Sequence, residues 1–414
     1  CEGSSAEAGK GSGACIARSK RFYRALSHAG HQVVLCSPPE GRQGTSMVTR
    51  VIKEGSFTCV VAISPFPAEC AVHSRTTLPM WIDLNGSHPA ELQVQDQSDP
   101  RYGERFLRML ALENGLLLRG DGFSAPSRRQ IAAVLGELLL LGRTGFNGVS
   151  GIELHPIPHC ADGFNPVAQR EAQQFTVVST GSFNVWFDEE TLFRGLEYAM
   201  ERNPSITFLS TGGSIPFSPG KYQNFRDLVE GSRHSSRFDL RGWVDSEELK
   251  EVYSRASAAV YTDVPSPETY LGARTRALDW ISRGIPVVCT SGAEISDDIE
   301  KHRLGLVVSQ LNWKQLGESI LQLAADPEIR KNIRNSQREW CLGEGSWNQV
   351  FDPLLKWCDR PTGASSEHLG KPTVPSMNST GYYAMQFREL SRRAGIGYGL
   401  KRVFRRIFLR GFLS

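Results

Sequence analysis

Carboxylates and arginines gather in one stretch of the chain, residues 265–288, which reads PSPETYLGARTRALDWISRGIPVV. Glu268 stands on a proline-bounded loop, and Arg274, Arg276 and Asp279 follow on a helix that we expect to end at Gly284. A short buried strand, 287–289, comes next. The N-terminus of a helix offers free N–H groups and a favourable dipole, and arginine makes bidentate contacts with phosphate. The pattern therefore predicts that this stretch binds a diphosphate, as in the nucleotide part of a nucleotide-sugar.

A second polar group follows another expected strand, 79–83, in the sequence WIDLNGSHPAE at 81–91. Ligands of open α/β sheets bind outside the carboxyl ends of the strands, so this loop is a candidate site. Asp83 is the residue that we expect to position or deprotonate an acceptor, with Glu91 and His88 as weaker candidates. Asp83 and Asn85 could instead cap the helix that begins near Pro89.

Size and composition favour a two-domain globular protein. The chain has 414 residues and no apolar run long enough to span a bilayer. Its nine cysteines show no paired or metal-ligand spacing, which fits a reducing cytoplasm and no metal site. Residues 361–414 hold nine Lys and Arg against two Asp and Glu, while the whole chain carries a net charge of +3. A basic tail on a mildly acidic body is typical of targeting.

Elements that could position these residues alternate along both halves of the chain. A helix is expected over about 14–28 and a strand over 32–36, but no strand precedes the Gly-rich start, so we expect a fragment or a disturbed N-terminus. In the second half, apolar runs at 175–180, 206–210, 238–240, 258–262, 287–290 and 306–309 alternate with helical patterns. Such alternation predicts parallel βαβ units, and therefore two Rossmann-like, doubly wound α/β domains.

The expected division of the chain has five parts. Residues 1–160 form an N-terminal Rossmann-like domain, 161–174 a hinge and 175–358 a second domain with the predicted diphosphate site. Residues 359–383 form a linker, and 384–414 a basic amphipathic tail that suits an anionic membrane surface. No recognition module for nucleic acid accompanies the tail, so we expect a cytoplasmic protein, peripheral on the inner face of the membrane.

The second domain resembles the donor-binding half of GT-B glycosyltransferases, especially retaining ones of the family 4 type (glycosyl transferases group 1). The matching stretches are VVSTGSFNVWFDEETLFRGLEYA at 177–199, FDLRGWVDSEELKEVYSRASAAVY at 238–261, and residues 265–288. The resemblance covers roughly 175–357 well and 14–160 more weakly, through the helix ending in AGHQVVL and through DGFSAPSRRQ. It implies two Rossmann-like domains that face each other across a cleft, with residues 1–160 on the acceptor side and residues 175–358 binding the nucleotide-sugar.

The resemblance also implies roles for residues of the second domain. Gly181 and Ser182 would face the donor phosphates, followed by Asn184, Val185 and Trp186 where family members often carry basic residues. Backbone groups of Gly242, Trp243 and Val244 would read the base, on which Trp243 could stack instead of packing against the protein.

The acids of the 265–288 stretch depart from the family's E-x7-E pattern. The second acid falls on Asp279, which could hydrogen-bond the ribose, whereas the nearest upstream acid is Glu268, with ten residues between the two. Either the loop is remodelled so that Glu268 reaches the donor sugar as a catalytic residue, or the role of the first acid is lost. Arg274 and Arg276 would then neutralise the phosphate charge. A plainer alternative is that Arg276 and Asp279 form a surface ion pair.

The expected function is transfer of a sugar from a nucleoside-diphosphate sugar to a cell-envelope or polysaccharide acceptor, glycan or lipid-linked. Arg274, Arg276 and the N–H groups around Thr269 to Gly272 would stabilise the leaving diphosphate. We expect no metal and no cofactor, and the family resemblance implies retention of configuration. Two alternatives remain open: a degenerate GT-B protein that binds a nucleotide-sugar or a partner without turnover, and a nucleotide-sugar epimerase.

Overall fold

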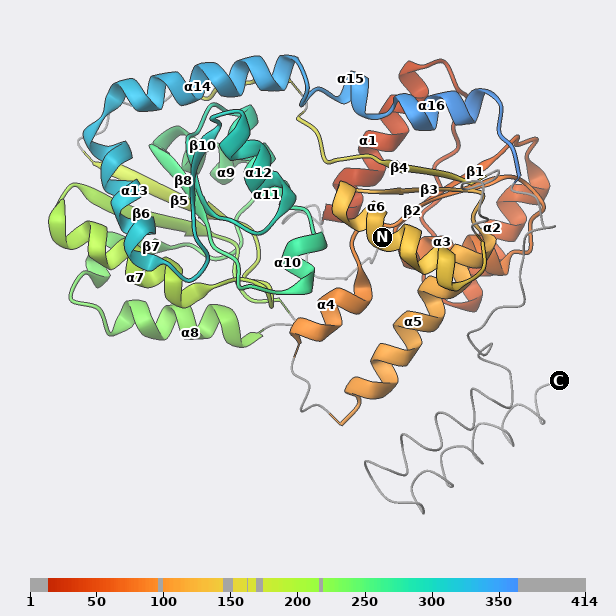
Figure 1. The fold of residues 1–414 in the computed structure, drawn as a ribbon, viewed down its shortest axis with the longest axis horizontal. Helices are drawn as coiled ribbons and strands as arrows, with labels where there is room; N and C mark the ends of the chain where they lie inside the picture. The colour runs from red at the N-terminus through yellow and green to blue at the C-terminus, as the bar shows by residue number, and fades with distance from the viewer. Residues whose placement is uncertain are drawn as a thin grey trace.

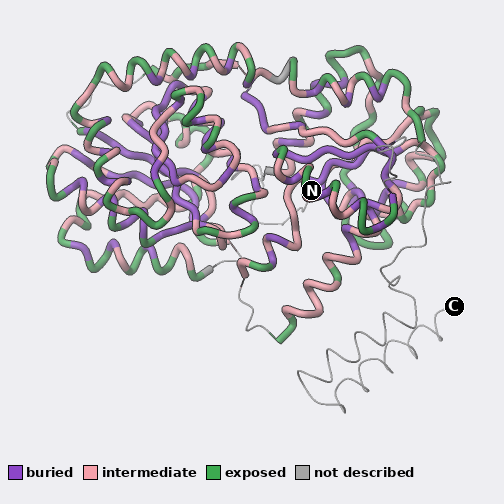
Figure 2. The backbone as a smooth tube through the Cα atoms, viewed as in Figure 1, coloured by how far each residue is buried: buried purple, intermediate pink, exposed green. Residues whose placement is uncertain are grey.

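The computed structural model describes residues 14–95, 100–143, 152–161, 163–168, 174–215 and 219–363. The predicted basic tail, 384–414, and most of the linker before it lie outside these residues. The described chain forms two lobes, and helices α14 to α16 run from one lobe across to the other (Figure 1). In both lobes the buried residues follow the strands (Figure 2).

The N-terminal lobe is built on a parallel sheet with the strand order β1-β2-β3-β4. The strands are Val60–Ile63 (β1), Met80–Asp83 (β2), Gly122–Ala125 (β3) and Glu153–Pro156 (β4). The helices of this lobe are Ala14–His28 (α1), Arg42–Glu54 (α2), Pro65–His73 (α3), His88–Val94 (α4), Tyr102–Arg119 (α5) and Arg128–Leu140 (α6). Apolar side chains of β2, including the fully buried Met80, Trp81 and Ile82, form the centre of its core.

The C-terminal lobe contains a six-stranded parallel sheet with the order β10-β9-β8-β5-β6-β7. The strands are Phe175–Thr180 (β5), Ile206–Thr211 (β6), Phe238–Leu240 (β7), Ala258–Tyr261 (β8), Val287–Thr290 (β9) and Gly305–Val308 (β10). The connection reverses direction between β5 and β8. In doubly wound sheets, such a switch point is where ligands bind.

Helices cover both faces of this sheet, and three of them begin at the side-chain caps Asp245, Asn312 and Asp326. The helices are Glu189–Arg202 (α7), Pro219–Glu230 (α8), Ser246–Arg255 (α9), Pro267–Leu271 (α10), Thr275–Ser282 (α11), Glu294–Lys301 (α12), Trp313–Ala325 (α13) and Pro327–Leu342 (α14). The Asp245 carboxylate accepts from the Glu248 N–H group at 2.9 Å, in a complete capping box. The predicted two-domain, doubly wound α/β fold is confirmed.

Two segments that pack in the N-terminal lobe differ from the sequence prediction, one near the start of the chain and one after α14. Residues 32–36 form no strand, and the side chains of Val34 and Leu35 are exposed. Helices Trp347–Val350 (α15) and Asp352–Asp359 (α16) belong to the expected second domain, but they pack on the first. The rings of Phe351 and Phe22 are 5.0 Å apart, and those of Trp357 and Trp81 are 5.5 Å apart. Within the described residues, the structure contains no helix long and apolar enough to cross a membrane.

Candidate active site

Three glycine turns meet at the carboxyl ends of β5, β6 and β7. Gly181, Gly212 and Gly242 all have positive φ angles, of 95°, 93° and 70°. The Gly212 N–H group donates to the Gly242 carbonyl at 2.6 Å, and a Cβ on Gly212 would lie 2.1 Å from the Gly181 carbonyl oxygen. Only glycine permits this approach of two backbones. The predicted phosphate loop at Gly181 and the predicted base loop at Gly242 therefore lie side by side.

Arg276 lies against the first of these turns. Its Nη2 donates to the Ser182 carbonyl at 2.7 Å, and a Cβ on Gly181 would lie 3.8 Å from its guanidinium carbon. Its Nη1 is buried and has no hydrogen-bond partner among the described residues. Burial lowers the pKa of Arg276, although the charge of Asp263 opposes that effect. A buried, unpaired cationic donor at the sheet switch point suits an anionic ligand.

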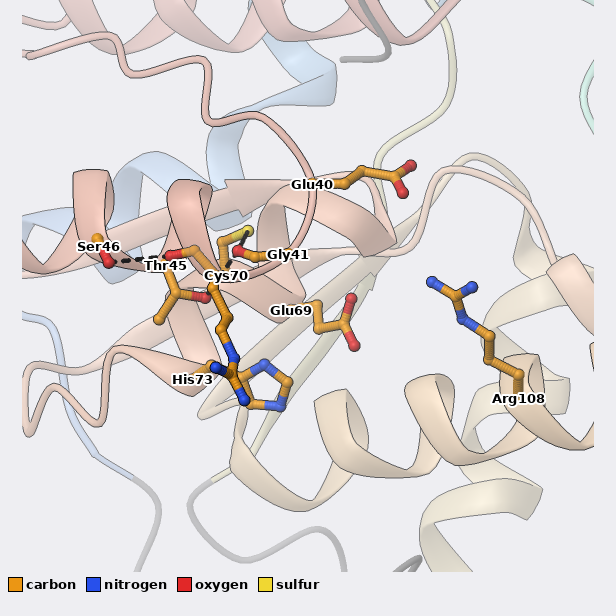
Figure 3. A pocket seen from close by; sticks show the side chains of 9 residues that line it. Glu40, Gly41, Thr45, Ser46, Glu69, Cys70, His73 and Arg108 are labelled. Atoms are coloured by element: carbon orange, nitrogen blue, oxygen red, sulfur yellow. Dashed lines mark hydrogen bonds between the residues drawn. The ribbon is translucent and has the colours of Figure 1, made fainter. Parts of the chain in front are cut away.

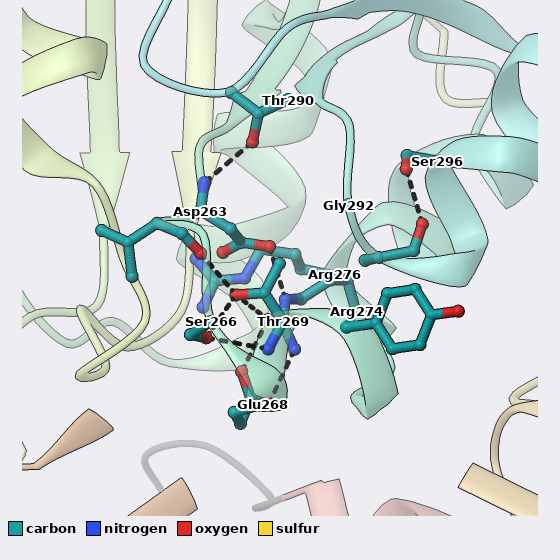
Figure 4. Close-up of polar contacts among 12 residues, drawn as sticks. Asp263, Ser266, Glu268, Thr269, Arg274, Arg276, Thr290, Gly292 and Ser296 are labelled. Carbon is teal, nitrogen blue, oxygen red and sulfur yellow. Dashed lines mark hydrogen bonds and ion pairs between the residues drawn. The ribbon is translucent and has the colours of Figure 1, made fainter. Parts of the chain in front are cut away.

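Arg274 has a different environment, in a buried cluster with Asp263 and Glu268 (Figure 4). Its Nε donates to Asp263 at 2.6 Å, and its Nη1 and Nη2 donate to the two oxygens of Glu268 at 3.0 and 2.8 Å. All three side chains are at most 5% exposed. Burial works to lower the pKa of Arg274, but the two carboxylates outweigh burial and raise it. Burial raises the pKa of Glu268, while Arg274 acts in the opposite direction.

In this arrangement Arg274 donates to two carboxylates through its Nε and both Nη atoms, which favours a structural role. Its predicted contact with a donor phosphate stays a prediction. Glu268 is likewise held by Arg274 rather than free to contact a donor sugar. The indole of Trp186 covers the cluster, since the guanidinium carbon of Arg274 lies 5.1 Å from its ring centroid.

Asp263 was not predicted as a site residue. It lies two residues beyond the end of β8, and its N–H group donates to the Thr290 hydroxyl at 2.9 Å. The signal that could have found it is the strand order, because the end of β8 adjoins the end of β5 at the switch point. The apolar pattern of the sequence predicts the strands, but it does not predict their order in the sheet.

The backbone of α10 is already satisfied within its own turn. The Thr269 N–H group donates to the Ser266 hydroxyl at 3.0 Å, and the Gly272 N–H group donates to the Glu268 carbonyl at 2.6 Å. The Glu268 side chain also lies directly against Gly272, since a Cβ on Gly272 would be 2.4 Å from a Glu268 carboxylate oxygen. The expectation that the N–H groups of Thr269 and Gly272 stabilise a leaving diphosphate is therefore not supported.

Asp279 does not pair with Arg276. It accepts a hydrogen bond from the Tyr253 hydroxyl and another from Arg283 Nε at 3.1 Å, and its side chain is 41% exposed. The alternative of an Arg276–Asp279 ion pair is therefore wrong, whereas contact of Asp279 with a ribose stays a prediction.

The residues predicted to read the base extend from the end of β7. Trp243 is largely exposed and its Nε1 donates to the Ser214 carbonyl at 3.3 Å, while Val244 is half-buried. Because Ser214 follows the Gly212 turn, this bond places the Trp243 ring near the three glycine turns. Its ring does not pack in the core.

Asp83 is engaged in a buried network of the N-terminal lobe. Arg18 donates to its two carboxylate oxygens at 2.6 and 2.7 Å, and the Ser124 hydroxyl donates to one of them at 2.6 Å. Arg18 also donates to the Ile157 carbonyl at 2.8 Å, which ties α1 to the end of β4. These contacts indicate a structural role and argue against Asp83 as an acceptor base. Nor does it cap α4, because the Ser87 hydroxyl accepts from the Ala90 N–H group.

A hollow of about 630 Å³ lies elsewhere, between α2, α3 and the outer part of α5 (Figure 3). Its charged lining comprises Glu40, Glu69, Arg42, Arg108 and His73. The mixed charges select no ligand class. None of the predicted site residues lines it.

The comparisons with known proteins agree with this architecture. Residues 174–326 match the family model described as Glycosyl transferases group 1. No curated protein matches the sequence. Sucrose-phosphate synthase from Thermosynechococcus elongatus is 17% identical over 85% of this chain and 94% of its own, with a TM-score of 0.62. HepE from Anabaena, solved with UDP and glucose, is 12% identical over 86% of this chain and 98% of its own, with a TM-score of 0.61.

TarM from S. aureus, a variant solved with fondaparinux, α-GlcNAc-glycerol and UDP, is 14% identical over 77% of this chain, with a TM-score of 0.57. This chain spans 59% of the length of TarM. At these identities the structures establish the fold and no more, and the family model covers only residues 174–326. The chain therefore has the fold of GT-B glycosyltransferases, and its C-terminal lobe is similar to the glycosyl transferases group 1.

Proposed function

We propose that the protein transfers a sugar from a nucleoside-diphosphate sugar to a cell-envelope or polysaccharide acceptor held mainly by the N-terminal lobe. The observation that carries the donor half of the proposal is the environment of Arg276. Its guanidinium lies beside the Gly181 turn, donates once to the Ser182 carbonyl, and keeps a buried Nη1 without a hydrogen-bond partner among the described residues. A donor diphosphate at the end of β5 would accept from this group.

The chemistry of the step follows from where charge develops. As the glycosidic bond to the donor breaks, negative charge builds on the departing diphosphate. A fixed guanidinium in a partly desolvated site stabilises that charge without reorganising. We therefore propose that Arg276 supports the leaving group without a metal ion, so that a chelator leaves turnover unchanged. Retention of configuration is proposed on the family resemblance alone.

The nucleotide would extend from Arg276 toward β7. The Gly212 turn lies between the predicted phosphate loop at Gly181 and the predicted base loop at Gly242, and its N–H group donates to the Gly242 carbonyl. Trp243 presents an exposed ring beyond the Gly242 turn. HepE and TarM were both solved with UDP, and a trehalose-6-phosphate enzyme from E. coli with UDP-2-fluoro glucose. These relatives make UDP the first nucleotide to test.

A second candidate function is binding of a nucleotide-sugar without turnover. The observation that favours it is the state of both predicted catalytic carboxylates. Asp83 is paired with Arg18, and Glu268 is paired with Arg274, so neither is available as a free base in this arrangement. Binding would persist in such a protein, but nucleotide release from donors would not be observed with any acceptor.

Calorimetric titration of the full chain with UDP tests the donor assignment. We expect wild-type binding and a loss of about 10- to 100-fold in affinity for Arg276→Ala, which is typical of a charge-assisted hydrogen bond to phosphate. Arg283→Ala is the matched control, since Arg283 ends the same helix and makes a half-exposed pair with Asp279. UDP, GDP and ADP sugars with lipid-linked and polysaccharide acceptors then separate turnover from binding.

Two results would overturn the proposal. Equal weakening by Arg276→Ala and Arg283→Ala would show that the effect is general surface charge and not phosphate contact. Failure of the wild-type protein to bind any of the nucleoside diphosphates would remove the donor site altogether.

A further inference from the structure

The N-terminus of α6, in the N-terminal lobe, receives a carboxylate from the C-terminal lobe. The backbone N–H groups of Arg128 and Arg129 donate to the two oxygens of Glu294, each at 3.0 Å. Glu294 is the first residue of α12, more than 160 residues further along the chain. A helix leaves its first N–H groups without intrahelical partners, and its dipole favours an anion there. The acid that caps α6 thus comes from the opposite domain.

The same turn makes further contacts across the two lobes. The Ser127 hydroxyl donates to the Leu271 carbonyl of α10 at 2.7 Å while it accepts from the Gln130 N–H group. Arg129 donates to the Gly292 carbonyl at 2.6 Å and forms an ion pair with Asp297.

Arg129 also closes over α10. Its guanidinium carbon lies 4.4 Å from the ring centroid of Tyr270. Figure 1 shows α4 and α10 at the junction of the lobes, and these two helices contact each other. Hydrogen bonds, an ion pair and a cation–π contact therefore join one helix start to both α10 and α12.

We propose that Glu294 is a positioning residue that holds the two domains in the closed arrangement needed for transfer. This inference rests on the proposed function, in which the donor lies on one domain and the acceptor on the other. The residues that we assign to the nucleotide all belong to the C-terminal lobe, so opening the domains leaves them together. Opening does separate donor from acceptor and admits water to the cleft, which slows transfer.

The Glu294 contact is suited to reversible closure. When the domains part, water satisfies both the α6 N–H groups and the carboxylate, so neither partner is stranded. Each hydrogen bond is charge-assisted, and such bonds are stronger than neutral ones. The Arg129–Asp297 pair is partly exposed and is weakened by salt, which makes closure dependent on ionic strength.

Three full-length proteins test the proposal: wild type, Glu294→Ala and the control Glu300→Ala. Glu300 lies on the same helix and is exposed, so its removal changes the charge of α12 without touching α6. For Glu294→Ala we expect a larger radius of gyration in small-angle X-ray scattering and a fall in kcat of about tenfold or more, with the UDP dissociation constant changed by less than about twofold. Glu300→Ala should match wild type in all three measurements.

Arg129→Ala removes separate side-chain contacts of the same junction from the other domain, those with Gly292, Asp297 and Tyr270, and it guards against misfolding of α12. Because the Arg129 side chain and the Glu294 carboxylate make different contacts, the double variant should be at least as open as either single variant. Unchanged scattering and unchanged kcat for both single variants would overturn the proposal. So would a loss of UDP affinity equal to the loss of kcat, because Glu294 would then belong to the donor site. If wild type binds no UDP, the proposed function fails, while the scattering comparison still decides whether Glu294 holds the domains closed.

Discussion

Replacement of Arg274 by alanine tests whether this arginine stabilises the fold or binds the donor phosphate. The change would leave two carboxylates, Asp263 and Glu268, buried at 3% and 5% exposure without their shared cation. Removing one partner of a buried ion pair costs about 3–5 kcal/mol, because the remaining charge stays desolvated. We therefore expect Arg274→Ala to lower the free energy of unfolding of the C-terminal domain by about that amount.

Urea unfolding, followed by tryptophan fluorescence, measures the stability term, and UDP titration below the unfolding transition measures binding. Arg283→Ala is again the control, since a half-exposed ion pair is worth about 1 kcal/mol or less. The double variant Arg274→Met/Glu268→Gln should recover part of the loss, because it removes one stranded charge together with the cation. UDP affinity should change little in any variant that remains folded.

The opposite pattern would refute this reasoning. If Arg274→Ala is as stable as Arg283→Ala and yet loses UDP affinity, Arg274 contacts phosphate as its position in the sequence predicts. The bonds to Asp263 and Glu268 would then belong to a resting state that the donor breaks.

Two further predictions concern the other lobe and the base. Burial raises the pKa of Glu113 from 4.5 to about 8, with repulsion from Glu137 and Glu91, and burial raises that of Glu137 to about 7. The stability gained from protonation of these two carboxyls is fully present below pH 4.5 and is lost as the pH rises through 7 to 8. Glu113→Gln should therefore have a higher thermal midpoint than wild type at high pH but not at pH 5. A difference between the two midpoints that is the same at both pH values would contradict this. Trp243→Ala should weaken UDP binding about tenfold if the ring stacks on the base, and an unchanged titration would exclude stacking.

The strands of the C-terminal lobe could be predicted almost residue by residue. Most of them are short runs of mainly apolar residues between amphipathic helices, so the pattern of hydrophobicity identifies them without tertiary information. The strands 175–180, 238–240 and 287–290 coincide with β5, β7 and β9. The helix starts at Asp245 and Asp326 follow from local side-chain chemistry in the same way.

The N-terminal lobe was less predictable because its contacts are non-local. Residues 32–36 have the composition of a strand, but a strand needs a neighbouring edge, and this stretch pairs with none of the described strands. The position of α16 is a second case, since Trp357 of this helix and Phe351 just before it pack against Trp81 and Phe22, more than 270 residues earlier in the chain. No local pattern indicates which lobe a terminal helix covers.

The two arginines at the start of α11 show where residue spacing stops being informative. Arg274 and Arg276 are two residues apart, and both suit a phosphate at a helix N-terminus. Arg274 precedes the helix, with φ −106° and ψ 84°, and its side chain enters the cluster formed by the ends of β8 and α10. Arg276 is inside the first turn, and its side chain reaches the Gly181 turn at the end of β5. Their difference in function therefore depends on which strand end each guanidinium meets, and strand order is a property of the folded sheet.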